Sequence, residues 1–496
     1  MSRTPVRIVH VIPQLSLGGA GRALISLVKY SSRFEAFEHE ILSLQKPDAM
    51  AVELALSSDA RTLTPVKNGT LETLNAADIV QFHFWNTPEI HLLLNANLPK
   101  MRSVVWLHVN GAYPPQSITA NVCNVGDIVV ASDSKSMHIP ALSKIATKLK
   151  VIIPGTDPER LDGHKPVDHA TFNVGYIGTL SFSKMHPDFV AMHAVLDIPD
   201  IRIIVYGEGQ AADTLKRQAK QLSVDDRFEF RGYAENIRDA LGALDVFGYP
   251  LCVGNYSTGE LALQEAMLAG VPPVVLPFGG AANRIIHGET GLIAQDTGGY
   301  SEAIRFLYKN PAIRARLGTN ATDHARREFS AETTALKFNE IYCGLMEGPK
   351  SSHLSPAKST LQFTARDGAS LFILSLGETD IDFRASLNRD GGKAAVAAEK
   401  LISDAASSLF ETLLQYRSYF PDDPSLRFWS GLLLQALGRP ALAASEFNRS
   451  VSLGCDHWRI YWHLAKAAGA AGSAELAARA AAQAKVSALR EGITLD

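Results

Sequence analysis

The feature that most constrains the fold is an alternation of short apolar runs with helical patterns, which occurs twice in this 496-residue chain. The runs are continuously apolar for the most part and do not alternate with period two, as is typical of strands buried on both faces of a parallel sheet. Residues 1–165 are therefore predicted to form a Rossmann-like α/β domain. Its strands are predicted at Arg7–Ile12, His39–Leu44, Asp78–Phe84, Ser103–Val109, Asp127–Ala131 and Val151–Pro154, and its helices include Ala20–Tyr30 and Ser134–Lys148.

A polar linker at residues 158–171 precedes a second series of the same kind, and residues 170–330 are predicted to form a second Rossmann-like domain. Two such domains in succession are typical of enzymes that bind their ligands in the cleft between them. The strands of the second domain are predicted at Phe172–Ile177, Ile201–Tyr206, Arg227–Phe230, Val246–Tyr249, Pro273–Leu276 and Leu292–Ala294.

The last part of the chain has a different pattern. Residues 347–390 are predicted to form a linker, at 347–361, and a small extension with one strand at Ala369–Leu376. Residues 391–496 are predicted to be helical, and small residues recur there at an interval of 34. This interval suits tetratricopeptide-like repeats, which stack into a concave surface, and a plain alanine-rich bundle is the alternative. We expect 391–496 to bind a protein partner or a protein acceptor, or to self-associate. The aligned residues are Gly431, Gly438, Ala443 and Ala444 with Ala465, Gly472, Ala477 and Ala478.

Charge and cysteine content exclude several classes of protein. The 48 Lys and Arg nearly balance the 51 Asp and Glu, so no nucleic-acid partner is expected. The 4 cysteines form no CxxC motif and indicate neither a disulfide framework nor a zinc site. No run of 18 apolar residues predicts a transmembrane helix. We expect a cytoplasmic protein whose membrane contact, if any, is peripheral and at the inner face.

Glycine-rich turns follow several predicted strands. Leu17-Gly18-Gly19-Ala20-Gly21-Arg22 opens a helix after the first strand, where the helix N-terminus offers N–H groups to an anion. A tight turn without a ligand is the alternative. Gly178 begins a loop that contains Lys184, at the end of a strand where ligands of parallel sheets bind. A solvated lysine is the alternative there. Gly207-Glu208-Gly209 is a weak match to the dinucleotide fingerprint.

The most informative segment is Ser257–Val275. A small polar loop, Ser257-Thr258-Gly259, leads into an amphipathic helix at Glu260–Ala269, and a buried strand follows. The helix N-terminus would point out of the sheet, so that Thr258 and Gly259 could cradle a phosphate. Glu265 is a carboxylate in an otherwise apolar helix. It would either lie exposed or bind hydroxyl groups.

Together these motifs resemble the family 4 glycosyltransferases, a retaining family with the GT-B fold, over about residues 6–346. Phe230-Arg231-Gly232-Tyr233, Gly270-Val271-Pro272 and Gly288-Glu289-Thr290-Gly291-Leu292 also fit the family's pattern. The resemblance implies transfer of a sugar from a nucleotide-sugar bound by the second domain to a glycan, lipid-linked or protein acceptor bound by the first. It also implies that a last helix, at Ala331–Met346, returns to the first domain.

The resemblance assigns three residues to catalysis. Lys184 matches the lysine that neutralises the donor diphosphate, Glu265 the glutamate that holds the ribose hydroxyls, and His108 an active-site histidine. From the sequence alone, a histidine satisfied inside the core fits position 108 as well. The further donor-binding residues that the resemblance implies are Gly18, Gly19, Gly178, Gly207, Arg231, Gly232, Tyr233, Ser257, Thr258, Gly259 and Glu260.

No cofactor is expected, because the nucleotide-sugar is a substrate. No metal is expected either, because the transferase region lacks the Asp-x-Asp motif of the other main transferase fold; the one such match in the chain, Asp380-Ile381-Asp382, lies beyond it.

The chain departs from the family at three positions. Ser257 stands where the first glutamate of a Glu-x7-Glu pair is expected, Thr179 where an arginine is usual, and Gly21 where a glutamate is common. Glu260 could replace the missing carboxylate if it lies in the loop before the helix. Two functions are therefore open: an active glycosyltransferase, or a degenerate transferase that acts as a scaffold through its helical region.

Overall fold

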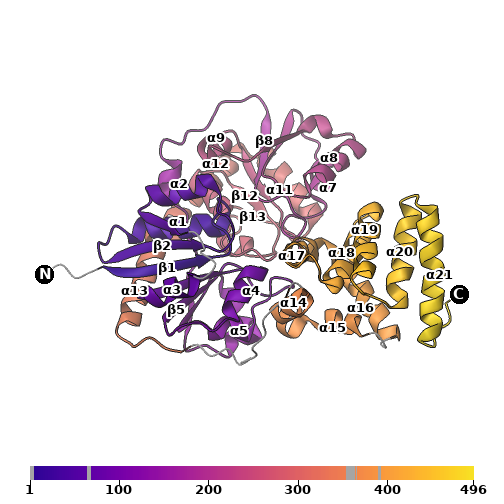
Figure 1. Ribbon diagram of the computed structural model, residues 1–496. Coiled ribbons are helices and arrows are strands. Elements are labelled where there is room, and N and C mark those ends of the chain that lie inside the picture. Colours follow the sequence, from indigo (N-terminus) through magenta and orange to yellow (C-terminus); the bar gives the residue numbers. More distant parts are fainter. Residues whose placement is uncertain (1–4, 64–68, 353–363, 365, 389–391, 496) are drawn as a thin grey trace. The chain divides into compact units, whose positions relative to one another are not determined.

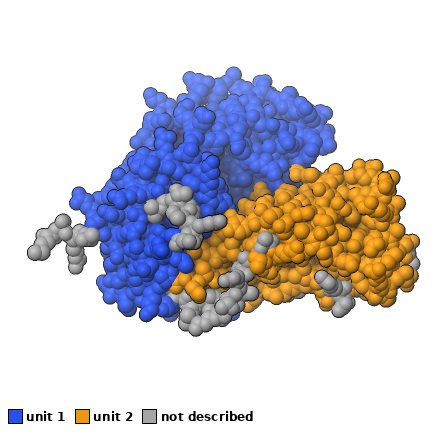
Figure 2. Space-filling view, in the orientation of Figure 1, with its two compact units in different colours: residues 1–84, 99–112, 125–353 blue, residues 85–98, 113–124, 354–496 orange. Residues whose placement is uncertain are grey.

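The computed structural model describes residues 5–63, 69–352, 364, 366–388 and 392–495 (Figure 1). The chain divides into two compact units (Figure 2). Unit 1 comprises Met1–Phe84, Pro99–Ala112 and Val125–His353. Unit 2 comprises Leu354–Asp496 together with two segments from the N-terminal part of the chain, Trp85–Leu98 and Tyr113–Asn124. Residues 353–361 of the second predicted linker lie outside the described residues.

Unit 1 contains a parallel sheet of seven strands in the order β3-β2-β1-β4-β5-β6-β7. The first five predicted strands are present. The sixth, β7, ends at Val151, where the prediction began, and β3 was not predicted. The strands are β1 Val6–Ile12, β2 Phe37–Ser43, β3 Ala60–Leu63, β4 Ile79–Phe84, β5 Arg102–Leu107, β6 Ile128–Ala131 and β7 Leu149–Val151.

The helices between these strands are α1 Gly19–Ser31, α2 Ala49–Ser57 and α3 Thr70–Ala76. The single helix predicted at Ser134–Lys148 is wrong. A 3₁₀ helix, η1, spans Ser134–His138, and a short helix, α6, spans Pro140–Ser143. The proline explains the break, because it disfavours helical backbone at the preceding Ile139, which is extended (φ −66°, ψ 129°).

A second parallel sheet in unit 1 has six strands in the order β10-β9-β8-β11-β12-β13, and all six were predicted. The strands are β8 Phe172–Ile177, β9 Ile201–Tyr206, β10 Phe228–Gly232, β11 Val246–Tyr249, β12 Pro273–Val275 and β13 Leu292–Ile293. The helices around them are η2 Pro158–Leu161, α7 Phe189–Ala194, α8 Ala212–Gln221, η3 Asp225–Arg227, α9 Ile237–Gly242, α10 Leu261–Leu268, η4 Ala281–Arg284, α11 Thr297–Lys309 and α12 Pro311–Glu328.

After α12 the chain returns to the first sheet. Helix α13, Ala331–Met346, packs against α1. Its buried Phe338 and Tyr342 share an apolar cluster with Ile8 of β1 and Trp106 of β5. The first sheet is therefore completed by a helix that follows the second sheet in sequence.

Unit 2 is helical in its described residues. The prediction of a strand at Ala369–Leu376 is wrong, because helix α14 spans Gly368–Leu376. Helices α18 and α20 begin 34 residues apart, as do α19 and α21, and the repeat itself stays a prediction. The helices are α4 Pro88–Leu94, α5 Ala120–Asn124, α14, η5 Gly377–Thr379, α15 Ile381–Leu387, α16 Gly392–Asp404, α17 Ala406–Tyr419, α18 Pro424–Ala436, α19 Pro440–Ser452, α20 Trp458–Ala470 and α21 Ala474–Arg490.

The side chain of Asn86 links the two parts of unit 2. It is fully buried, just before α4, and its amide donates to Pro115 O (2.6 Å) and to Ser375 Oγ (2.9 Å). Its carbonyl oxygen accepts from the Tyr416 hydroxyl (2.7 Å), and its backbone N–H donates to Gln116 Oε1 (2.7 Å). The crossover segments that follow β4 and β5 are thus joined to helices that lie about 300 residues later in the chain.

No helix within the described ranges combines the length and the apolar character needed to cross a membrane.

Candidate active site

The candidate site is built around the buried carboxylate of Glu260, next to the carboxyl ends of β8 and β11. This carboxylate accepts hydrogen bonds from Ser257 Oγ (2.5 Å) and from the Tyr249 hydroxyl (2.8 Å), and Lys184 Nζ lies 3.8 Å from Oε2. Burial and the nearby Glu260 carboxylate raise the pKa of Tyr249 well above its ordinary value, so its hydroxyl remains a donor. Three segments that are separate in sequence therefore meet at one acidic group.

The backbone of Glu260 is strained. Its φ of 51° and ψ of 46° lie in the left-handed region, which costs an L-residue roughly 1–2 kcal/mol. The residue lies just before α10, so it belongs to the loop and not to the helix that was predicted to begin there. Backbone strain in a buried residue whose side chain is fixed by hydrogen bonds is typical of functional sites.

Three of the glycines predicted to bind the donor lie at the ends of neighbouring strands. Gly207 donates its N–H to Gly232 O (2.7 Å), and its φ of 140° suits only glycine. A Cβ atom on Gly207 would lie 1.9 Å from Gly178 O. The turns after β8, β9 and β10 thus pack backbone against backbone. This packing by itself explains why residue 207 is a glycine, so the glycine is not evidence of a ligand.

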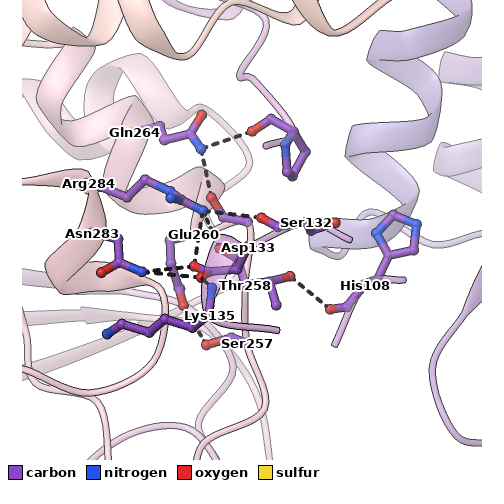
Figure 3. Close-up of polar contacts among 12 residues, drawn as sticks. His108, Ser132, Asp133, Lys135, Ser257, Thr258, Glu260, Gln264, Asn283 and Arg284 are labelled. Carbon is purple, nitrogen blue, oxygen red and sulfur yellow. Dashed lines mark hydrogen bonds and ion pairs between the residues drawn. The ribbon is translucent and has the colours of Figure 1, made fainter. Parts of the chain in front are cut away.

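The loop before α10 also contacts the first sheet (Figure 3). Thr258 Oγ1 donates to His108 O (3.2 Å), and Arg284 Nη2 donates to Thr258 O (2.7 Å) and reaches Ser132 O (3.5 Å). Arg284 is buried and lies 3.7 Å from the Asp133 carboxylate, to which the Asn283 amide also donates (3.2 Å). These contacts join the loop to the segment that follows β6.

His108 follows β5, as predicted, and it contacts the loop before α10 through its backbone. The contact with Thr258 uses the backbone carbonyl of His108, and the imidazole points away from it (Figure 3). The ring stacks with His83 and contacts Trp106 inside the first sheet, and burial lowers its pKa to about 3. The imidazole is therefore neutral at physiological pH.

Glu265 lies inside α10 and is buried. Of the two alternatives that the sequence left open, the exposed helix residue is therefore wrong. Its carboxylate pairs with the Arg160 guanidinium of η2 and accepts a long hydrogen bond from Thr156 Oγ1 (3.4 Å). Among the described residues, no ion pair or hydrogen bond connects Glu265 to Lys184 or Glu260. Glu265 and Glu260 thus have different cationic partners, Arg160 and Lys184, and a shared donor site stays a prediction.

The remaining predicted residues lie around a second contact between the two sheets. Arg22 of α1 donates to the Tyr233 hydroxyl (2.5 Å), and Arg231 donates to the Tyr206 hydroxyl (2.9 Å). Gly18 and Gly19 are exposed at the start of α1, where its first N–H groups are accessible. Gly259 packs on Pro154, whose Cγ would lie 2.8 Å from a Cβ atom at that position.

Four side chains of this region were not predicted: Tyr249, Asp133, Arg160 and Arg284. Tyr249 ends a predicted strand. Its position at the end of a parallel strand, the argument that was used for Lys184, could therefore have identified it. Asp133 closely follows β6 and could have been found in the same way. Arg160 lay in a segment interpreted as a linker, and no sequence signal distinguishes Arg284 from other arginines.

No group of three or more His, Cys, Asp or Glu side chains in the described part of the chain is placed to hold a metal ion.

The segment that holds this site is similar to a known family. Residues 160–324 match the model of the family described as "Glycosyl transferases group 1". This segment is similar to that family. It contains Lys184, Glu260 and Glu265, together with all six strands of the second sheet.

Curated relatives of the chain include a synthase and a rhamnosyltransferase. The N-acetyl-alpha-D-glucosaminyl L-malate synthase of Bacillus anthracis is 26% identical over 157 residues, which are 31% of this chain and 40% of that protein. The D-rhamnosyltransferase WbpZ of Pseudomonas aeruginosa is 26% identical over 309 residues, 56% of this chain and 77% of that protein. The chain spans 40% to 43% of the first three curated relatives.

Solved structures of other proteins share the fold. HepE of Anabaena, solved in complex with UDP and glucose, has a TM-score of 0.58 and 19% identity, over 68% of this chain and all of that one. A glycosyltransferase from Rickettsia africae has a TM-score of 0.57 and 16% identity, over 70% of this chain and all of that one. The two-sheet architecture of unit 1 is thus that of known glycosyltransferases.

Proposed function

We propose that the chain moves a sugar from a nucleotide-sugar donor to a glycan, lipid-linked or protein acceptor, with retention of the anomeric configuration. The observation that carries the proposal is the convergence of Lys184, Ser257 and Tyr249 on Glu260 within a glycosyltransferase group 1 domain. Retention rests on the resemblance to family 4. In this proposal no metal takes part.

The electrostatics of the site suit a diphosphate. Lys184 is only 17% exposed, and its one carboxylate partner is 3.8 Å away, a loose contact that a phosphate oxygen can compete with. Ser257 and Tyr249 hold Glu260 in place independently of Lys184. With Thr179 in place of the family's arginine, Lys184 is the cation that we expect to bind the donor.

A screen of nucleotide-sugars tests this function. UDP-glucose comes first, because HepE was solved with UDP and glucose, followed by GDP-, ADP- and dTDP-sugars. A true donor should stabilise the protein by about 2.7 kcal/mol at a concentration of 100 times its Kd. Transfer or donor hydrolysis should continue in EDTA. Failure of every nucleotide-sugar to stabilise the chain would contradict the proposal and favour the scaffold function.

Replacement of Lys184 should impair the donor reaction. Leaving-group charge grows on the diphosphate in the transition state, so Lys184→Ala should cost about 2–4 kcal/mol in kcat/KM. The measurement is steady-state kinetics with the donor found in the screen. Lys220→Ala, at an exposed position on α8, is the matched control and should behave as wild type. Unchanged kinetics in Lys184→Ala would show that Lys184 does not bind the donor.

Replacement of His108 should separate binding from turnover. His108 follows a strand of the first sheet, so His108→Ala should leave the donor Kd nearly unchanged and lower kcat about 100-fold, the scale of a lost acid–base group. Donor titration and single-turnover transfer measure the two effects. His138→Ala, at an exposed histidine on η1, is the control. A weakened donor Kd with unchanged kcat would contradict this role.

The helical residues 391–496 are proposed to bind a protein partner or a protein acceptor, or to self-associate. Sedimentation of the full chain distinguishes a dimer from a monomer. A cytoplasmic location, with any membrane contact at the inner face, is part of the same proposal, and fractionation of cells that express the chain tests it.

A further inference from the structure

A buried ion pair in unit 2 joins two helices, α16 and α20, that are far apart in the sequence. Glu399 of α16 accepts a hydrogen bond from Arg459 Nε of α20 (2.6 Å), and the two side chains are only 3% and 1% exposed. His463 Nε2, one turn further along α20, lies 3.3 Å from the second carboxylate oxygen of Glu399, and His463 Nδ1 lies 3.1 Å from Gln435 Oε1 of α18. We call Arg459, His463 and Gln435 the carboxylate site.

The guanidinium of the carboxylate site is also held by α15. Arg459 Nη2 donates to Ser386 O (3.2 Å) and to Asn388 O (3.3 Å), at the end of that helix. Helix α15 is fixed in turn by Trp429 of α18, whose indole N–H donates to Ser386 Oγ (2.7 Å) and whose ring packs edge-on against Phe383. None of these contacts involves α16, so the guanidinium would stay in place if α16 left.

Helix α16 packs against α15 and α18 with one narrow face (Figure 1). Its buried residues are Ala395, Ala398, Glu399 and Ile402, and of these only Ile402 belongs to the apolar cluster of unit 2. Within the described residues, Glu399 is the one side chain of α16 with a hydrogen bond or ion pair to another helix. Helices α17 to α21 pack one on the next without it. The stack of helices therefore does not depend on the apolar contacts of α16.

The ion pair that holds α16 contributes little net stability. The attraction within a buried pair offsets the desolvation of its two charges only when further hydrogen bonds satisfy both groups. Here the guanidinium reaches Glu399 through Nε, and Nη1 of Arg459 is buried without a hydrogen-bond partner among the residues that the structure describes. Another carboxylate can therefore take the place of Glu399 at small cost.

We propose that α16 is an exchangeable occupant of the carboxylate site, and that the face of α18 and α20 beneath it binds a partner protein's helix that carries a glutamate beside small residues. The model for that helix is α16 itself: Ala395 and Ala398 allow close approach, and Glu399 supplies the charge that Arg459 requires. The partner role of residues 391–496 rests on the proposed function. Release of α16 is measured without a partner, so failure of one proposal is distinguishable from failure of the other.

Hydrogen exchange of the full chain tests whether α16 can leave. Glu399→Lys places a like charge opposite Arg459, so the amides of residues 392–404 should exchange about 100-fold faster, the scale of a broken buried ion pair, while α18 to α21 keep their wild-type rates. Asp404→Lys, at an exposed position of the same helix, is the control and should exchange as the wild type does. Unchanged protection of α16 in Glu399→Lys, or loss of protection in all of 392–495, would overturn the proposal.

A labelled peptide of residues 392–404 tests whether the vacated face binds a helix. Fluorescence anisotropy should give a Kd for the Glu399→Lys chain about 100-fold lower than for the wild type, because the apparent Kd rises as the fraction of chains with an open site falls. The same peptide with Glu399→Gln should bind the Glu399→Lys chain about 100-fold more weakly. Equal affinity of the peptide for both chains, or equal affinity of both peptides, would overturn the proposal.

A second variant releases α16 without adding a positive charge. Ala395 is fully buried on the packed face of α16, so Ala395→Asp places an unpaired carboxylate there and leaves Arg459, His463 and Gln435 unchanged. Hydrogen exchange and peptide binding should both follow those of Glu399→Lys. If Ala395→Asp releases α16 and the wild-type peptide still does not bind, the face of α18 and α20 is not a binding surface and the proposal is overturned.

Discussion

A chain that ends at residue 352 should lose the native packing of α4 and α5. The segments Trp85–Leu98 and Tyr113–Asn124 belong to unit 2, and truncation removes the rest of that unit. Buried Asn86 would lose two of its hydrogen-bond partners, Ser375 and Tyr416, and the apolar Leu92 would lose the cluster of helices on which it packs. We expect aggregation or a thermal transition that is no longer cooperative, measured by calorimetry and by soluble yield.

A point variant tests the hydrogen bond between Tyr416 and Asn86 in the full chain. Tyr416→Phe leaves the Asn86 oxygen buried without its donor, which should cost about 1–3 kcal/mol of unfolding free energy. Tyr461→Phe is the matched control, because the Tyr461 hydroxyl bonds Asp456 at an exposed position of the same unit. A truncated chain with a wild-type melting profile would show that the N-terminal segments fold without the C-terminal helices.

Replacement of Arg284 by methionine should destabilise unit 1 by about 3–5 kcal/mol, the range for removal of one partner from a buried ion pair. Arg284 is 1% exposed. Its guanidinium forms an ion pair with the Asp133 carboxylate and donates a hydrogen bond to the carbonyl oxygen of Thr258. Methionine fills much of the volume but leaves both acceptors without this donor. Urea unfolding gives the loss of stability.

The same variant should weaken donor binding if the proposed function is right, because Thr258 lies in the loop between Ser257 and Glu260. Arg326→Met, at an exposed position near the end of α12, is the control for the loss of an arginine. A loss below about 1 kcal/mol in Arg284→Met would contradict this expectation and would mean that water replaces the guanidinium.

Strands buried on both faces were predictable because they are short, mostly apolar runs without period-two alternation. The predicted bounds of β8, β9 and β11 are those of the structure. The same criterion led to the wrong strand at Ala369–Leu376, since a short apolar run without a period also fits a helix that is buried on most sides. Seven of the nine residues of α14 are buried, so its sequence carries no amphipathic signal.

The candidate site was only partly predictable because its contacts depend on pairs that sequence spacing does not reveal. Lys184, Ser257 and Glu260 were each proposed from a motif, and the structure adds the shared contact with Tyr249. The pairing of Glu265 with Arg160 could not be foreseen, because it joins a helix to a segment without a period. The contacts of His83 with His10 and His108 were not predictable for the same reason, because the offset of two residues per strand exists only once the register is known.

Unit 2 combines segments that are far apart in the sequence, and this has a consequence for synthesis of the chain. Tyr416 follows Asn86 by 330 residues, so a ribosome that adds roughly 5–20 residues per second needs roughly 15 to 65 s between them. During that interval the crossover after β4 is complete, but the helices that bury Asn86 and Leu92 do not yet exist. The nascent chain must therefore leave the amide of Asn86 and the side chain of Leu92 without their native partners for most of its translation.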